Sequence, residues 1–258
     1  MRSASDTEIE IPFPDTGDLH LRFTVGACRL RLTPGEGDHW VKGTYNDPTG
    51  NLPLRIDQEG GNVRFSHQPT WTDIFGWLAG TPRLELALGN ARPYALSFES
   101  GASEVSLDLG GLPITRLTAK HGAGRMEIDF PSRNPQAMSL LSLGAGAGDT
   151  LVRNLANANC AEMIIEGGAA SYRFDFGGEL QRDAHVRIST GVSSLEISIP
   201  RTTAAKVTPE SVLGGMDVDD GFIKKEGAFW TDAAIAGRSP GITIHASVAL
   251  GKLRLRAT

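Results

Sequence analysis

The sequence predicts an all-β fold, arranged as a β-solenoid of stacked coils with two strands in each coil of about 22 residues. Three observations lead to this prediction. A motif of glycine, a small residue, two variable residues and three alternating apolar residues recurs along the chain. Its copies are evenly spaced, and each follows another run with apolar residues at alternate positions. Alternation at every second residue indicates strands, and a fixed period of this length indicates stacked repeats.

The recurring motif has four clear copies and one weaker copy that begins at Gly146. The clear copies span residues 101–109, 122–130, 168–176 and 191–199, and successive starts are 21 to 24 residues apart. Because successive side chains of a strand lie on opposite faces, the three apolar residues of each copy share one face. In a stack, equivalent residues lie about 4.8 Å apart and form continuous apolar columns. The alternative is a β-sandwich, in which such residues are not aligned.

The outer parts of the chain follow the same pattern less regularly. In the first part, Gly26 to Leu32 repeats the motif, and Leu52 to Ile56 with Val63 to Phe65 continues the alternation, which predicts early coils. Residues 66–82 interrupt the pattern as an aromatic insertion, and residues 86–200 contain the regular coils. Residues 201–258 mix turns with short strands and predict a C-terminal cap, which ends in a pair of strands from Gly241 to Leu255. Together, residues 1–258 read as one domain.

The Gly146 copy is out of phase with the others. Thr150 and Asn154 occupy places where the other copies have apolar residues, whereas Leu151 and Leu155 fall in the opposite phase. Because a slip of one residue reverses the two faces of a strand, we expect a bulge or a bent strand here.

Composition and charge exclude several classes of protein. The net charge is −5, so the chain lacks the broad positive field that attracts a nucleic-acid backbone. No window approaches the ~18 apolar residues of a membrane span. Residues 1–9 contain no apolar core of a signal peptide. As written, the chain is therefore expected in the cytoplasm, and an export segment missing from this sequence would place it in the cell envelope.

The reactive side chains form no local catalytic or metal-binding motif. Cys28 and Cys160 are far apart and lack metal-ligand spacing, so we expect two buried, unpaired thiols. The six histidines are scattered singly, and no Gly-x-Ser-x-Gly segment is present. We therefore expect no metal, no cofactor and no enzymatic activity.

The aromatic insertion holds the candidate partner-binding residues. Trp71, Ile74, Phe75 and Leu78 have helical spacing, and Trp77 flanks them, so one short helix would present an apolar stripe. An exposed stripe of this kind marks a contact surface. The alternative is that the stripe covers an open edge of the stack.

Several segments resemble a known bacterial family. They are the repeats with Gly191–Pro200, Gly214–Phe222, Gly227–Trp230 and the final Leu253–Leu255. The chain resembles the toast-rack putative adhesin family and the similar C-terminal domain of cell-wall-active-antibiotic response proteins, over residues 86–258 and more weakly over 18–65. The resemblance implies a β-solenoid without established catalytic residues. Family members often follow a membrane segment or an export signal, and the Trp71 segment is not part of the family pattern.

Two functional hypotheses follow. The first is a non-catalytic interaction or scaffold module of the adhesin-like type, whose partner is an unknown protein or a component of the cell envelope. The second is a carbohydrate-binding or carbohydrate-active β-helix protein, which requires a groove with clustered charges and stacked aromatic residues. Exposed coil ends also allow the chain to oligomerise.

Overall fold

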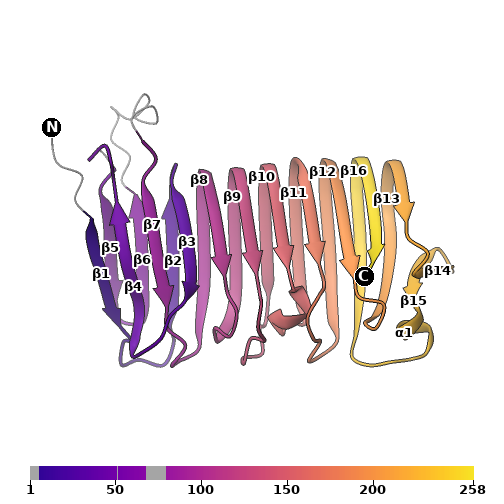
Figure 1. The fold of residues 1–258 in the computed structure, drawn as a ribbon, viewed down its shortest axis with the longest axis horizontal. Helices are drawn as coiled ribbons and strands as arrows, with labels where there is room; N and C mark the ends of the chain where they lie inside the picture. Colours follow the sequence, from indigo (N-terminus) through magenta and orange to yellow (C-terminus); the bar gives the residue numbers. More distant parts are fainter. Residues whose placement is uncertain (1–5, 51, 68–79) are drawn as a thin grey trace.

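The computed structural model describes residues 6–50, 52–67 and 80–258, and these residues are predominantly β-strand. The all-β prediction is therefore confirmed. Sixteen strands of the described residues join in one hydrogen-bonded sheet (Figure 1). The strands are β1 (Thr7–Pro12), β2 (His20–Val25), β3 (Arg29–Pro34), β4 (His39–Asn46), β5 (Leu54–Glu59), β6 (Asn62–His67), β7 (Arg83–Leu88), β8 (Tyr94–Asp108), β9 (Ile114–Asp129), β10 (Leu141–Arg153), β11 (Glu162–Asp175), β12 (Ala184–Ile199), β13 (Ala204–Val218), β14 (Phe222–Lys225), β15 (Ala228–Thr231) and β16 (Gly241–Ala257).

The long strands β8 to β13 and β16 give the molecule its shape. Each runs along one side of the stack, bends in the middle and returns along the other side (Figure 1). Neighbouring long strands are parallel, so each strand contributes one limb to each side.

The register of these strands aligns the repeats as the sequence predicts. Ala102, Ala123, Ala147 and Ala169, which follow the motif glycines, are paired in series from strand to strand. In the first limbs of β8 to β12, one continuous buried column is formed by Leu96, Leu117, Leu141, Met163 and Val186. Since full burial of a large apolar side chain is worth about 1.5–3 kcal/mol, these columns are a main source of stability.

The bulge predicted as one alternative at the Gly146 copy is wrong. Strand β10 pairs with β9 and β11 without a register shift, and Thr150 lies between Met126 and Tyr172 in the buried column. Threonine is small and β-branched, which suits a strand interior, so its hydroxyl does not force a bulge. Leu155 belongs to a short 3₁₀ helix, Leu155–Ala158, and is buried there instead of in the strand.

The bends depend on glycine. Gly124 and Gly148 both have φ near +114°, a conformation that residues with a side chain rarely adopt. A Cβ atom on Gly148 would lie 2.0 Å from the carbonyl oxygen of Gly124 in the neighbouring strand. These glycines therefore allow the tight corners at which the strands bend.

The last part of the chain does more than cap the stack. The order of the strands is β12, β16, β13, so the C-terminal strand β16 lies between two strands that precede it in sequence. Strand β13 pairs in parallel with β16 on one side and, on the other, with β15 through Lys206 and Val207. The β14–β15 hairpin and the short helix α1 (Asp232–Ile235) lie at this end (Figure 1). Within residues 201–258, β13 and β16 thus extend the stack.

The N-terminal strands also differ from the regular coils. Strands β2 and β6 are parallel to the first limb of β8, and β3 and β7 are parallel to its second limb. Strands β1, β4 and β5 instead pair antiparallel at this end.

Two further sequence predictions can be compared with the structure. Cys28 and Cys160 are free and buried, as expected. Burial raises the pKa of the Cys28 thiol to about 12 and that of the Cys160 thiol to about 11. Among the described residues, no helix has the length and apolar content required to cross a membrane.

Candidate functional site

The predicted partner-binding residues lie outside the described residues. Trp71, Ile74, Phe75, Trp77 and Leu78 all fall between His67 and Gly80, where the structure gives no description. Their role therefore stays a prediction. The residues on either side of this segment are described, and both His67 and Gly80 line the same pocket.

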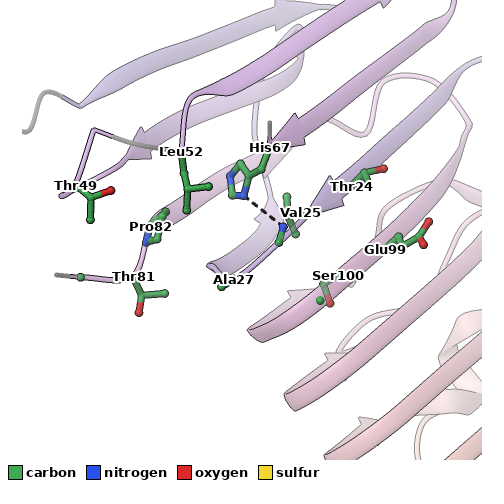
Figure 2. Close-up of a pocket in the computed structure, with 13 residues that line it drawn as sticks. Thr24, Val25, Ala27, Thr49, Leu52, His67, Thr81, Pro82, Glu99 and Ser100 are labelled. Carbon is green, nitrogen blue, oxygen red and sulfur yellow. Dashed lines mark hydrogen bonds between the residues drawn. The ribbon is translucent and has the colours of Figure 1, made fainter. Parts of the chain in front are cut away.

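The pocket has a volume of about 540 Å³. It lies at the level of the bends, near the N-terminal end of the stack (Figure 2). Its described lining comes from five separate parts of the chain: Thr24, Val25, Gly26, Ala27, Thr49, Leu52, His67, Gly80, Thr81, Pro82, Glu99, Ser100 and Gly101.

The strand arrangement explains why a pocket forms here. Strands β6 and β7 occupy places in the stack equivalent to the two limbs of β8, with β2 and β3 in between. In β8 the two limbs join through the tight bend at Gly101, whereas residues 68–82 join β6 to β7. The pocket therefore lies where the repeated bend is replaced by a longer connection, and its described walls come from the ends of β2 and β6, the bend of β8 and the adjoining loops.

His67 is a buried polar residue of the pocket wall. It is 9% exposed, and its Nδ1 accepts a hydrogen bond from the backbone N–H of Gly26 at 3.4 Å. Its Nε2 is buried and has no hydrogen-bond partner in the described structure. Burial lowers the pKa of His67, although the nearby Asp47 carboxylate opposes this shift. The imidazole is therefore neutral near pH 7.

A network around Leu52 fixes the wall next to His67. The Asp47 carboxylate accepts hydrogen bonds from the backbone N–H groups of Leu52, at 2.7 Å, and Thr49, at 2.9 Å. Burial opposes ionisation of Asp47, but these hydrogen bonds outweigh it, so the pKa of Asp47 is lowered. The Tyr45 hydroxyl donates to the Leu52 carbonyl oxygen, and the Tyr45 ring lies 5.5 Å from the His67 ring. Burial raises the pKa of Tyr45.

The opposite wall connects the pocket to the neighbouring strand β9. The Ser100 hydroxyl lies 2.7 Å from Nδ1 of His121, which is buried in β9. Burial also lowers the pKa of His121, despite a backbone hydrogen bond to Gly124 that raises it. The Nε2 atom of His121 has no hydrogen-bond partner in the part of the chain that the structure describes.

These surroundings suit binding of an apolar group. Val25, Ala27, Leu52 and Pro82 provide apolar wall area, and Glu99 is the one charged residue among the described lining residues. Pockets of about 300–1,000 Å³ with apolar walls and a few polar groups are typical of small-ligand sites. In the ranges that the structure describes, no group of three or more His, Cys, Asp or Glu residues could hold a metal ion.

Comparison with protein families identifies the chain. A family model described as the N-terminal domain of toast_rack, DUF2154, matches residues 2–150, which is more than half of the sequence. The chain belongs to the toast-rack family. The matched part of this toast-rack chain includes the N-terminal strands and the pocket, a region in which the sequence resemblance was expected to be weaker.

Solved structures are similar to the chain at low sequence identity. A putative cell adhesion protein from Clostridium sporogenes is similar with a TM-score of 0.51 and 13% identity, over 99% of this toast-rack chain and 100% of the other. A putative adhesin from Bacteroides fragilis gives a TM-score of 0.38 and 8% identity, over 99% and 98% of the two chains. A putative lipid-binding protein from Parabacteroides distasonis gives 0.31 and 11%, over 97% of each. No curated protein sequence matches significantly.

Sequence reasoning did not find the pocket. Its residues come from positions 24–27, 49–52, 67, 80–82 and 99–101, which no local motif connects. One signal was available: the position directly before a motif glycine is polar in Ser100, His121 and Thr190, although it points inward. A polar residue in an inward position indicates a buried hydrogen-bonding site.

Proposed function

We propose that this toast-rack chain is a non-catalytic interaction module of the adhesin-like type, built as a β-solenoid, which seats an apolar group of its partner in the pocket. The observation that carries this proposal is the apolar pocket of about 540 Å³ at the replaced bend, lined by strand ends and loops. A preformed wall favours binding because little conformational entropy is lost when the partner docks.

The polar groups near the pocket support binding over catalysis. The Asp47 carboxylate is already engaged by the backbone of its own loop, and it holds Leu52 in place. The Ser100 and His121 side chains are buried and contact each other. The likeness in fold to a putative cell adhesion protein from Clostridium sporogenes agrees with an interaction role.

The proposal can be tested by filling the pocket. Ala27 lies in the exposed rim of the pocket, so we expect Ala27→Trp to fold normally while it occupies the space. Ala147→Trp is the matched control, because Ala147 is also exposed at a bend but lies in β10, away from the pocket. The measurement is retention of bacterial cell-envelope proteins on the immobilised chain, together with the melting temperature of each variant.

We expect Ala27→Trp to lose retention and Ala147→Trp to keep it, with unchanged melting temperatures. Equal retention by both variants would remove the pocket from the binding surface. Retention of purified envelope glycans instead of proteins would favour the carbohydrate-binding hypothesis.

A further inference from the structure

We propose that the C-terminal end of the stack is an interface with a second copy of this chain, in which the second limb of β13, residues 214–218, pairs antiparallel with its counterpart around Met216. This inference goes beyond the proposed function, because the pocket lies near the other end of the stack and takes no part in the contact.

The outer edge of β13 is open over most of its length. On one side β13 pairs with β16 from Ala204 to Val218, whereas on the other side only Lys206 and Val207 pair with β15. In Figure 1 β13 is the last long strand, and β14, β15 and α1 lie beside its lower part. No strand of the described residues pairs with the rest of this edge. The unpaired backbone groups of such an edge are a template for another strand.

The apolar interior of the stack is also uncovered at this end. Met216 continues the column of Leu195 and Leu253, which are both 0% exposed, but Met216 itself is 43% exposed. Leu213, at the bend of the same strand, is 65% exposed. At the N-terminal end, by contrast, Ile9 of the outer strand β1 is buried. A strand that pairs with the open edge of β13 would therefore gain free energy by covering apolar area.

The charge on the second limb of β13 does not oppose this contact. Asp217 is the one charged residue among residues 214–218. Its carboxylate lies 3.0 Å from the Arg256 guanidinium and 3.8 Å from Nζ of Lys252, and both partners belong to β16, on the side away from the open edge. Two copies of this limb can therefore approach each other without bringing unpaired like charges together.

The second limb is also the more regular part of this edge. In the first limb and the bend, Pro209 has no backbone N–H, and the pairing with β16 shifts register after Pro209 and after Val212. From Gly214 to Val218 the pairing has no shift. A two-fold axis perpendicular to this limb at Met216 reverses the strand direction, so the two copies pair antiparallel and Met216 faces its own counterpart.

A second β13 fits this end better than the N-terminal end of another copy does. It offers the same unpaired backbone and the same exposed methionine, and a two-fold contact closes after two copies. The outer strands β1 and β5 instead expose Glu8, Glu10 and Glu59, whose carboxylates would lose hydration against the apolar end. The expected product is therefore a dimer and not a filament.

Sedimentation equilibrium of the full chain over a wide range of concentrations tests the dimer. We expect a reversible monomer–dimer equilibrium with no larger species. Met216→Asp brings an unpaired carboxylate from each copy into the contact, so we expect the dimer dissociation constant to rise about 10-fold or more. Ile56→Asp is the matched control, because Ile56 is a 38% exposed apolar residue of the outer strand β5 at the other end. We expect this control to keep the wild-type dissociation constant, and the melting temperatures show that both variants fold.

A cysteine at the two-fold axis tests the register. Opposed residues of antiparallel strands have Cα atoms about 4.5–5.5 Å apart, a distance that a disulfide spans. We expect Met216→Cys to form a disulfide-linked dimer under mild oxidation and Ile56→Cys to stay monomeric, since Cys28 and Cys160 are buried. Peptides covering residues 216–218 of the wild-type chain should also exchange hydrogen more slowly as the concentration rises.

Four results would each overturn the inference. They are a wild-type chain that stays monomeric at every concentration, species larger than a dimer, equal effects of Met216→Asp and Ile56→Asp, and absence of the disulfide-linked dimer in Met216→Cys.

Discussion

His67 and His121 are two buried histidines near the pocket. His67 and His121 each have one ring nitrogen in a hydrogen bond and one that is unpaired within the described structure. Burial lowers the pKa of both below the ordinary value of 6.5. Each ring is therefore neutral in the folded chain at pH 7, and its protonation opposes folding.

This arrangement predicts acid sensitivity. Between the lowered pKa of the folded chain and 6.5, the unfolded chain binds more protons, so stability falls as the pH decreases through this window. Above pH 6.5 the stability contribution is complete. We expect the melting temperature of the wild-type chain to fall more steeply between pH 7.5 and 5 than that of His67→Gln/His121→Gln. The exposed His20→Gln serves as control. Equal slopes for wild type and the double variant would contradict this prediction.

The sequence reveals burial of single residues better than their contacts. The two cysteines lacked any partner motif, and the structure confirms that they are buried and free. The motif alignment also placed Ser100 and His121 at equivalent positions, and they pair in the sheet. The contact of His67 with Gly26 was not predictable, because 41 residues separate them and β6 has no motif glycine.

At the scale of strands, the bends were predictable because a corner restricts both conformation and space. Gly124, Gly148 and Gly251 are paired with neighbours at the bends and have positive φ. In each case an added Cβ would lie about 2 Å from a carbonyl oxygen of the adjacent strand. Alternating apolar residues alone specify a strand, and these glycines specify where it turns.

Two alanine substitutions in β10 test whether the bend requires glycine. Gly148→Ala introduces a side chain at φ +114° and against the Gly124 carbonyl. We therefore expect it to lower the free energy of unfolding by about 1–3 kcal/mol. Gly144→Ala is the control in the same strand, because its Cβ would have ordinary contact with Lys120, at 3.8 Å. Urea denaturation measures both. Similar losses for the two variants would show that the bend tolerates a side chain.

The loops opposite the bends are held by asparagine side chains that the sequence reading did not single out. Asn134 and Asn157 are buried, and the Asn134 amide donates to the Ile114 carbonyl at 2.8 Å. The Asn157 amide donates to the Phe130 carbonyl at 2.9 Å, and its oxygen accepts from the Glu179 N–H at 2.9 Å. These contacts link loops of successive coils. They were not predictable because the loops vary in length and carry no repeated motif.

Removal of the Asn157 side-chain amide is expected to lower the free energy of unfolding by more than its hydrogen bonds contribute, because their partners are left unpaired. In Asn157→Ala the Phe130 carbonyl and the Glu179 N–H lose their partner, so we expect a loss of about 1–3 kcal/mol in the free energy of unfolding. The exposed Asn62→Ala is the control, and we expect a change below about 0.5 kcal/mol. A loss in Asn157→Ala no larger than in the control would show that water replaces the amide.

At the scale of the whole molecule, the sequence predicted the aligned strands β8 to β12 but not the order of the last strands of the sheet. Strands β8 to β12 follow one another in both sequence and space. Strands β13 and β16 carry similar alternating patterns, and nothing in either pattern specifies which of them neighbours β12. The packing of the folded chain decides this order, and it places β16 between β12 and β13.

The two ends of the stack also differ. At the N-terminal end the outer strands β1 and β5 carry charged residues such as Glu8, Glu10, Arg55 and Asp57, which discourage pairing with another chain. At the other end Leu213, Met216, Ile223 and Ile235 are exposed apolar residues. Association through coil ends, if it occurs, is therefore expected at the β13 end.

Hydrogen exchange can test the order of the stack directly. Leu253 and Met216 lie side by side in one column, but Leu253 is 0% exposed between β12 and β13, whereas Met216 is 43% exposed at the end. We expect peptides covering Leu253–Leu255 to exchange as slowly as those covering Leu195–Ile197, and peptides covering Met216–Val218 to exchange faster. A C-terminal strand paired only at an edge would reverse this result, because it would open first by local fraying. Fast exchange over Leu253–Leu255 would therefore contradict the inserted position of β16.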